Sequence, residues 1–362
     1  MKRNKNSFAA LYLLGHAMLI MGCIVSITVC LLTFILGKWG NTESIWVYRL
    51  MILRPVSILC CLVFFFITWK KTRKLSYVAM LTALIGMSEI GSIGTLVNHK
   101  TATKPTYQVL SYNIGGIAKI ADQHALLYEF ESLISEILVS QPAIIAFQEY
   151  PKQVKASTLD SIYVYQQSHF TDSLSSYGTK IYSRYPIVES QPIVFDRTTS
   201  NNALVCHIRI GKDTLQVMNM HLQSTGFNQM KDHLLIPYIG LEHKAQDAYH
   251  SFVWQLQENR EKRIEQAEML NTYIATAKTG IIACGDLNTV SHTETYELLT
   301  EHLCDAFKTA GFGLSPTYES LFNLFRVDYF LYSPHKIEAQ DYTLMPFEHS
   351  DHTCISFHFS FK

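Results

Sequence analysis

Acidic residues are nearly absent from the first 100 positions of the 362-residue sequence, where 11 Lys+Arg accompany only 2 Asp+Glu. The remaining positions carry 19 Lys+Arg and 28 Asp+Glu. The formal net charge of zero therefore hides a basic N-terminal part of charge +9 and an acidic C-terminal part of charge −9. Two physically different segments meet near residue 100.

Several common site motifs are also missing. The eight cysteines include no CxxC pair, and four of them lie in apolar runs, so we expect no disulfide framework. There is no Walker loop, no HExxH zinc motif and no Ser or Cys nucleophile motif. These absences argue against P-loop nucleotide hydrolysis, zinc-protease chemistry and covalent catalysis.

Charged side chains are absent from residues 8–37, a run of 30 residues. About 20 apolar residues cross the hydrocarbon core of a bilayer, and this run is too long for a signal peptide. Two further apolar runs follow at about 51–69 and 77–97. Glu89 lies in the last run, where it either faces a helix partner or headgroups or has a functional role. We predict a membrane anchor over residues 1–100 with three transmembrane helices.

Basic residues give the anchor a direction. Two clusters flank the runs: Lys2, Arg3 and Lys5, and then Lys70, Lys71, Arg73 and Lys74. Basic flanks of membrane helices remain on the cytoplasmic side. We therefore expect a protein of the cytoplasmic membrane whose N-terminus is cytoplasmic and whose residues after about 100 lie outside.

Residues 101–362 show short apolar strands that alternate with amphipathic helices, which predicts an α/β (α+β) domain. Helical spacing appears at about 126–138 and 263–275, and the polar segment 223–258 is interpreted as an insertion, either a lid or a surface near the membrane. The expected strands are Tyr107–Tyr112, Ala143–Phe147, Ile181–Tyr182, Leu204–Ile210, Leu215–Leu222, Ile281–Cys284, Val327–Tyr332 and Thr353–Phe359.

Polar residues stand at the ends of these apolar strands, where they are more informative than on a solvated surface. They are Asn113, Glu149, His221, the pair Asp286 and Asn288, Asp328, and the run His349–Ser350–Asp351–His352. Taken singly, each has an ordinary explanation as a turn residue, a solvated strand end or a core histidine. Asp286 and Asn288 are harder to dismiss, because alternate residues of an extended segment point the same way.

Together these residues suit hydrolysis of a phosphoester. Hard cations such as Mg²⁺ bind carboxylate oxygens, which Glu149 and Asp351 can supply. A carboxylate or an imidazole must also orient and deprotonate the attacking water. Asn and His donors can then stabilise the charge that develops on the phosphate oxygens.

The order N…QE…NxHL…GDLN…VDY…SDH resembles that of the endonuclease/exonuclease/phosphatase superfamily. This superfamily includes deoxyribonucleases, apurinic-site endonucleases, neutral sphingomyelinases and inositol-polyphosphate phosphatases. The resemblance covers residues 106–362 and implies a four-layer sandwich of two packed β-sheets flanked by helices, with the site at one edge. It includes lesser hallmarks at Gly178, Ile181–Pro186, Arg263 and Gln266–Ala267.

On the metal side, the resemblance implies that Glu149 is the principal Mg²⁺ ligand, with Mn²⁺ as the alternative ion. Asn113 would help Glu149, and Asp351 would be a further carboxylate beside the metal. Asp286 would position or deprotonate the nucleophilic water, and Asn288 would hold the water or the phosphate.

On the phosphate side, the resemblance implies that His352 contacts the scissile phosphate while Asp328 fixes its tautomer and raises its basicity. His221 would donate a hydrogen bond to the phosphate. Some apurinic-site enzymes have an acid at the position of Gly115 and a tyrosine at that of His221, so both positions argue against DNA repair.

We therefore expect a membrane-anchored, Mg²⁺-dependent phosphodiesterase or phosphatase whose substrate lies outside the cytoplasm, such as a phospholipid or another envelope component. An extracytoplasmic nuclease is the alternative, although a charge of −9 would repel a polyanion. A catalytically inactive binding or scaffold protein is a third hypothesis. It would require loss of one of the motif acids, and none is missing.

Overall fold

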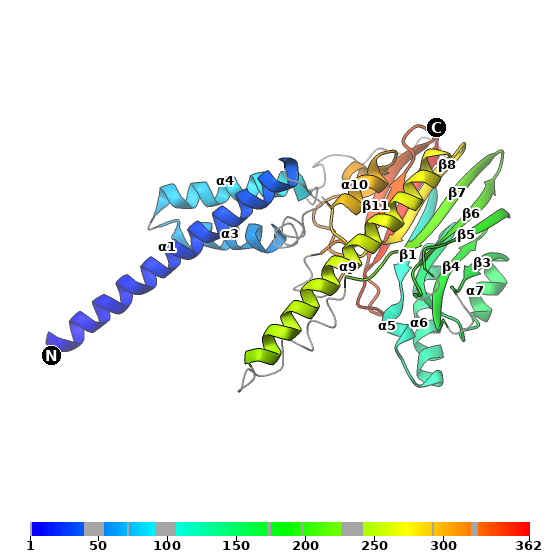
Figure 1. Ribbon diagram of the computed structural model, residues 1–362. Helices are drawn as coiled ribbons and strands as arrows, with labels where there is room; N and C mark the ends of the chain where they lie inside the picture. Colours follow the sequence, from blue (N-terminus) through cyan, green and yellow to red (C-terminus); the bar gives the residue numbers. More distant parts are fainter. Residues whose placement is uncertain are drawn as a thin grey trace. The chain divides into compact units, whose positions relative to one another are not determined.

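The computed structural model describes residues 2–39, 54–70, 72–90, 106–171, 175–196, 199–225, 242–291, 293–319 and 325–362. The chain divides into two compact units, Met1–Ile93 and Gly94–Lys362 (Figure 1). Within the described residues, the first unit consists of helices and the turn that joins two of them, whereas the second contains two β-sheets and the helices that cover them.

The N-terminal unit packs three helices: α1 (Lys2–Trp39), α3 (Arg54–Thr68) and α4 (Arg73–Ile90). Its interior is small and partly polar, and the buried positions include Cys23, Cys30, Cys61, Ala79, Ala83, Thr33, Ser57, Thr68, Ser76 and Thr82. Two glycines allow close helix contacts, because a Cβ on Gly22 would lie 2.9 Å from the Phe64 ring and one on Gly86 would lie 2.8 Å from Ile58.

By length and apolar composition, the described residues contain one helix able to cross a membrane, Leu14–Ile35. The helix Val56–Thr68 is apolar but shorter. This count corrects the expectation of three spans, since the structure supplies one helix of sufficient length. The predicted second span begins in residues 51–53 and the predicted third span ends in residues 91–97, and both ranges lie outside the described residues. The side chain of Glu89 also lies outside the described part.

The C-terminal unit contains two six-stranded sheets. Sheet A runs in the order β11 (Ile337–Met345), β12 (Cys354–Phe361), β1 (Tyr107–Asn113), β2 (Ile144–Pro151), β4 (Tyr177–Ser183) and β3 (Tyr165–His169). Sheet B runs in the order β5 (Ile187–Val194), β6 (Asn202–Ile210), β7 (Asp213–His221), β8 (Gly280–Asp286), β10 (Asp328–Tyr332) and β9 (Cys304–Asp305). Each predicted strand lies in one of these sheets.

Three longer strands were not predicted: β3, β5 and β11. All three lie at sheet edges, where one side of the ladder is unpaired and fewer side chains are buried. Five successive residues of β5 are exposed, and Pro192 lies among them, as is usual for an edge strand. Edge strands therefore lack the continuous apolar run by which the central strands were recognised.

Helices complete a four-layer arrangement. Helix α6 (Gln123–Ser140) buries Leu126, Phe130 and Ile134 against sheet A, and α9 (Glu242–Ala275) buries Ala267 and Leu270 against sheet B. A third apolar cluster lies between the two sheets. Smaller helices follow the strands: α5 (Gly115–Ala118), α7 (Ser157–Ile162), α10 (Glu294–Thr300) and α11 (Ala306–Ala310). The expected fold, two packed sheets flanked by helices, is confirmed.

The predicted insertion 223–258 is described only in part. Residues 242–258 are the first half of the continuous helix α9, and residues 226–241 lie outside the described part of the chain. The second half of α9 packs on sheet B and has the expected apolar stripe, whereas Trp254 in the first half is 65% exposed. The sequence of the first half has no periodic apolar pattern to reveal it.

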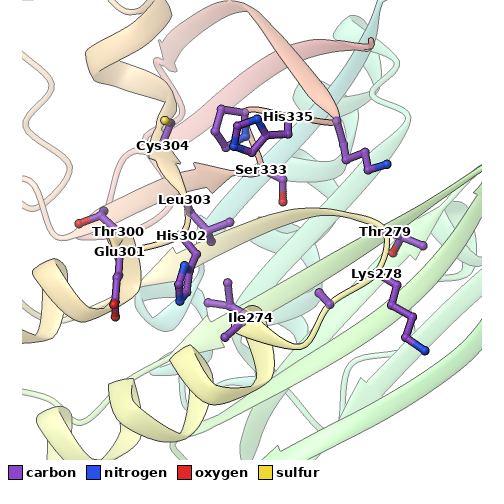
Figure 2. Close-up of a pocket in the computed structure, with 14 residues that line it drawn as sticks. Ile274, Lys278, Thr279, Thr300, Glu301, His302, Leu303, Cys304, Ser333 and His335 are labelled. Carbon is purple, nitrogen blue, oxygen red and sulfur yellow. The ribbon is translucent and has the colours of Figure 1, made fainter.

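A cavity of about 470 Å³ lies at the end of sheet B where β8 begins (Figure 2). It is lined by Ile274, Ala275, Ala277–Thr279, Thr300–Cys304 and Ser333–Lys336. None of the polar residues predicted for the site lines it. They lie instead where β1, β2, β7 and β8 end.

Candidate active site

Parallel strand pairing brings the predicted residues to one edge of the sandwich. In sheet A, Asn113 at the end of β1 pairs with Gln148 of β2, so Glu149 lies next to it. In sheet B, His221 at the end of β7 pairs with Asp286 at the end of β8. Asp328 pairs with Asp286 from the antiparallel strand β10.

Asn113 joins the two sheets at this edge. Its Nδ2 atom donates hydrogen bonds to Glu149 Oε1 at 3.2 Å and to Asp286 Oδ2 at 3.0 Å. Its Oδ1 atom accepts from the Gly115 N–H at 3.0 Å. A single buried amide therefore fixes a carboxylate of sheet A close to a carboxylate of sheet B.

Glu149 has a backbone conformation that a non-glycine residue rarely adopts, with φ of 51°. It lies in a β-bulge, where the pairing of β2 with β4 shifts between Phe147 and Tyr150. A Cβ on Gly115 would lie 2.3 Å from Glu149 Oε2. The missing side chain of Gly115 thus lets this carboxylate pack against the backbone, which gives a steric reason for the absence of an acid at that position.

His221 and His352 approach the same carboxylates. His221 Nε2 lies 3.6 Å from Glu149 Oε1 and 4.0 Å from Asp286 Oδ2. His352 Nε2 lies 3.7 Å from Asp286 Oδ2. Two imidazoles therefore face the central carboxylate of Asp286 from two different elements.

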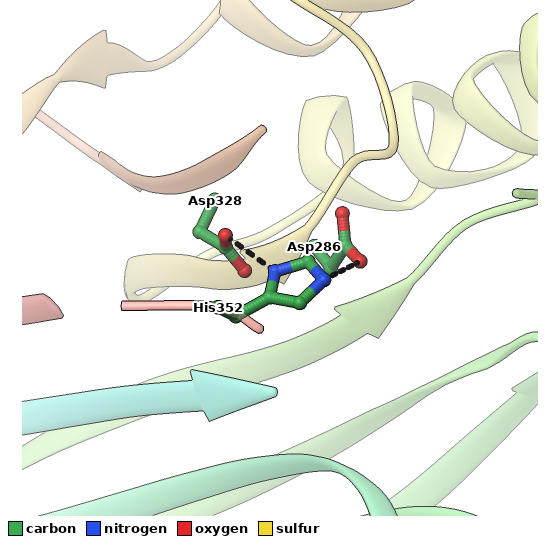
Figure 3. Close-up of side chains that lie close together, drawn as sticks. All are labelled: Asp286, Asp328 and His352. Carbon is green, nitrogen blue, oxygen red and sulfur yellow. Dashed lines mark hydrogen bonds and ion pairs between the residues drawn. The ribbon is translucent and has the colours of Figure 1, made fainter. Parts of the chain in front are cut away.

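Asp328, His352 and Asp286 form a buried row (Figure 3). His352 Nδ1 lies 2.9 Å from Asp328 Oδ2, which leaves Nε2 directed toward Asp286. Burial lowers the pKa of His352, but the charges of Asp328 and Asp286 outweigh it and raise the pKa to about 10. At neutral pH His352 is therefore a cation that can donate a hydrogen bond from Nε2.

Burial raises the pKa of Asp286, and the charges of His352 and His221 oppose that rise. The carboxylate is anchored through Oδ1, which accepts the Asn288 N–H at 2.7 Å. A carboxylate whose pKa lies nearer to neutrality is a better general base at neutral pH. Asp286 is thus placed and tuned to accept a proton.

Ligand atoms of Asp286, Asp328 and His352 lie within 4.8 Å of one another, a spacing that a metal ion could bridge. A metal ion bound there would have to displace the proton of His352. Without a metal, the hydrogen bond between His352 and Asp328 makes the row a hydrogen-bond relay. A hard divalent cation fits Glu149 and Asn113, because carboxylate and carboxamide oxygens are its preferred ligands.

Asn288 and Asp351 are placed less directly than expected. Asn288 Nδ2 donates to the Leu222 carbonyl at 2.9 Å, so part of its amide already binds the segment that follows β7. Asp351 lies at the rim, where its Oδ2 atom is 3.6 Å from Lys119 Nζ and both side chains are partly exposed. The preceding His349 lies 2.7 Å from Glu129 and 3.1 Å from Glu136, which ties this loop to α6.

Sequence reasoning missed three residues that support the site: Thr317, Gln148 and Asn219. The Thr317 hydroxyl accepts the N–H groups of Val327 and Asp328, both at 3.0 Å, and so fixes the start of β10. Nothing in the sequence marks Thr317. Gln148 and Asn219 do stand inside the QE and NxHL motifs, and that position was the available signal.

The model of the family described as Endonuclease/Exonuclease/phosphatase matches residues 110–352. No curated protein matches the sequence. Among solved structures, TDP2 from Caenorhabditis elegans is 18% identical with a TM-score of 0.51, over 84% of this chain and 88% of that chain.

Two further structures each have a TM-score of 0.50. TDP2 from D. rerio, complexed with single strand DNA product, is 16% identical over 71% of this chain and 100% of that chain. An endonuclease/exonuclease/phosphatase from Beutenbergia cavernae is 14% identical over 71% of this chain and 72% of that chain. At such identities, these similarities concern the fold.

Proposed function

The chain belongs to the endonuclease/exonuclease/phosphatase family, and we propose that it is a membrane-anchored, Mg²⁺- or Mn²⁺-dependent phosphoester hydrolase with an extracytoplasmic substrate. The observation that carries this proposal is the convergence of Glu149, Asn113, Asp286 and His352 from both sheets at one edge. A scaffold that had lost catalysis would not need a base and a cationic donor arranged in this way.

Glu149 and Asn113 would hold the cation, and Asp351 at the rim would add charge to its surroundings. Gly115, which has no side chain, makes room for the Glu149 carboxylate at this position. A bound divalent cation supplies charge stabilisation to the phosphate oxygens and lowers the pKa of a coordinated water.

The remaining residues have complementary roles. Asp286 Oδ2 orients and deprotonates the attacking water, while Oδ1 stays fixed by the Asn288 N–H. The His352 imidazolium, held by Asp328, donates a hydrogen bond to a phosphate oxygen, and His221 donates a second. Donors that are already oriented before reaction need no rearrangement as charge develops.

Membrane anchoring is supported by the exposure pattern of the N-terminal helices. Small and hydroxyl side chains are buried between them, whereas large apolar side chains face outward on all three, including Met18, Ile24, Phe66, Leu81 and Leu84. Water-soluble bundles show the opposite pattern, while helices in lipid pack through small residues. The anchor would hold the enzyme beside a bilayer, so a phospholipid or another envelope component is the leading substrate.

A nuclease is the second candidate, and the observation that favours it is the similarity to a D. rerio TDP2 structure that holds a single strand DNA product. The acidic balance of residues 101–362 opposes it, since nucleic-acid binders usually neutralise phosphates with Lys and Arg. A substrate panel separates the two candidates.

The full-length protein in detergent should be assayed with Mg²⁺ or EDTA on bis-nitrophenyl phosphate, nitrophenyl phosphate, choline and ethanolamine phospholipids, and single-stranded DNA. We expect metal-dependent release from a small or lipid phosphoester, and loss of turnover by at least about 100-fold in Glu149→Gln and His352→Ala. The distant Asp341→Asn variant should retain wild-type turnover. DNA cleavage alone would favour the nuclease, and activity retained in EDTA would contradict the metal dependence.

A further inference from the structure

A seam of four polar side chains crosses the interface between the two sheets beside its apolar cluster. Gln148 and Thr179 come from sheet A, Asn202 and Asn219 come from sheet B, and all four have 0% exposure. Burying polar groups costs free energy unless they are hydrogen-bonded. The seam lies at the end of the sandwich where Glu149 and His221 are placed.

The seam meets the β-bulge that carries Glu149. Phe147 pairs with Lys180 and Tyr150 pairs with Gly178, so two residues of β2, Gln148 and Glu149, lie opposite the single Thr179 of β4. A bulge of this kind interrupts the ladder and leaves backbone groups without their usual partners.

Asn219 binds both strands beside this bulge from the other sheet. Its Nδ2 atom donates to the carbonyl of Phe147 at 2.8 Å and to that of Lys180 at 3.1 Å, the last pair before the bulge. Its Oδ1 atom accepts from Gln148 Nε2 at 2.6 Å, and the same Nε2 also donates to Ser111 at 3.1 Å. Both ends of the Asn219 amide are therefore committed to the bulge.

We propose that Asn219 is a positioning residue that stabilises this bulge and so directs the Glu149 carboxylate toward the divalent cation. The inference rests on the proposed function, in which Glu149 is the principal ligand. Without the bulge, pairing would shift by one residue, and a shift of one residue turns a side chain to the opposite face of a sheet.

Thr179 offers a matched control inside the same seam. Its hydroxyl donates to Asn202 Oδ1 at 2.7 Å, so it also joins the two sheets through a fully buried hydrogen bond. That bond reaches none of the bulge carbonyls. A loss of inter-sheet stability alone should affect both links, whereas a loss of Glu149 orientation should follow Asn219 only.

The test measures Mn²⁺ binding to the full-length protein in detergent, from the electron paramagnetic resonance signal of free Mn²⁺, together with the melting temperature. Asn219→Leu should raise the Mn²⁺ dissociation constant by about 10-fold or more, the usual effect of losing a group that orients a metal ligand. Thr179→Val should lower the melting temperature but leave the dissociation constant within about threefold of wild type, because no metal-orienting contact is lost. Equal weakening in both variants, or normal binding by Asn219→Leu, would overturn the proposal.

Gln148→Met provides a second test if Asn219→Leu is not recovered folded. It removes the donor that holds the Asn219 side chain but keeps the donors that Asn219 gives to the bulge. We expect Mn²⁺ binding weaker by several-fold, and unchanged binding would overturn the role of the seam. A wild-type protein that bound no Mn²⁺ would instead overturn the proposed metal dependence, together with any role of Asn219 toward a metal.

Discussion

At the scale of single residues, the site is set by carboxylates in unequal surroundings. The Asp328 N–H donates to the Thr317 hydroxyl, which fixes Asp328 at the start of β10. One oxygen of the Asp328 carboxylate binds His352. Asp286 has two imidazoles nearby and a pKa raised by burial. The two aspartates pair in register across β8 and β10. Nevertheless, Asp328 orients the His352 imidazolium, whereas Asp286 can act as a base.

The row predicts the effect of Asp328→Asn. Removing the negative neighbour should lower the pKa of His352, so less of it is protonated, and the ring loses its fixed orientation. Turnover at neutral pH should fall by about 100-fold or more. In the wild type, activity should persist until the pH approaches the His352 pKa of about 10, and in the variant this alkaline loss should begin at lower pH.

A pH–rate profile of kcat measures both changes, and Mn²⁺ binding should stay within about threefold of wild type because Asp328 is not assigned to the metal. Asp341→Asn, on the edge strand β11, is the matched control and should show the wild-type profile. An unchanged alkaline limb in Asp328→Asn would contradict the assignment of that limb to His352.

At the scale of elements, β10 is fixed by a buried ion pair of Arg326, two residues before Asp328. Arg326 donates to both oxygens of Asp305, at 3.1 and 2.5 Å, and its guanidinium lies over the rings of Phe307 and Tyr329. Tyr296 donates to the same carboxylate at 2.8 Å. The pair joins the β9–α11 corner to the residue that precedes Val327 and Asp328.

Asp305 predicts a dependence of stability on pH. Burial alone would raise its pKa, but Arg326 and Tyr296 hold the pKa below the usual value of 3.8. A carboxyl whose pKa is lowered on folding contributes stability above its unfolded pKa, and that stability is lost as pH falls through the folded pKa. The wild type should therefore lose stability below about pH 4 partly through Asp305.

Denaturant unfolding of the C-terminal unit, Gly94–Lys362, between pH 3 and 7 measures this contribution. Asp305→Asn should lower the free energy of unfolding at pH 7 by about 3–5 kcal/mol, because the buried Arg326 loses its partner. Its stability should also decline less steeply in acid. Glu189→Gln at a 68% exposed side chain should change the free energy by no more than about 0.5 kcal/mol. A pH profile parallel to wild type in Asp305→Asn would contradict the lowered pKa.

At the scale of the whole molecule, the chain joins two units with opposite surface chemistry. The N-terminal unit exposes large apolar side chains and buries small and hydroxyl ones, whereas the C-terminal unit buries three apolar clusters. The basic flanks of the first unit and the acidic balance of the second follow the same division.

This division predicts the topology of the full-length protein in a bacterial membrane. An alkaline phosphatase fused after Lys362 should be active, because the basic flank keeps the N-terminus inside and an odd number of crossings, such as the single helix Leu14–Ile35, places the C-terminus outside. A green fluorescent protein at the same position should be dark, and the protein should remain in the membrane after alkaline carbonate extraction. A fluorescent, phosphatase-inactive C-terminus would instead place the catalytic unit in the cytoplasm, as an even number of crossings would.

The sequence alone determined those features that depend on short-range pattern. The central strands and the helix at 126–138 followed from apolar periodicity, and the polar residues at strand ends stood out because buried strands tolerate few of them. The family followed from the resemblance of the motif order. Asn113, Glu149, His221, Asp286, Asp328 and His352 were identified in this way, and the structure brings them together at one edge.

Tertiary structure decided what depends on contacts between distant segments. The sequence could not reveal that Asn219 of one sheet binds the bulge of the other or that Thr317 fixes β10, whereas the contact of Asp328 with His352 was already implied by the resemblance. The first two contacts join strands or loops that are far apart along the chain. Edge strands escaped prediction for a related reason: they lack the buried face that gives central strands their periodic pattern.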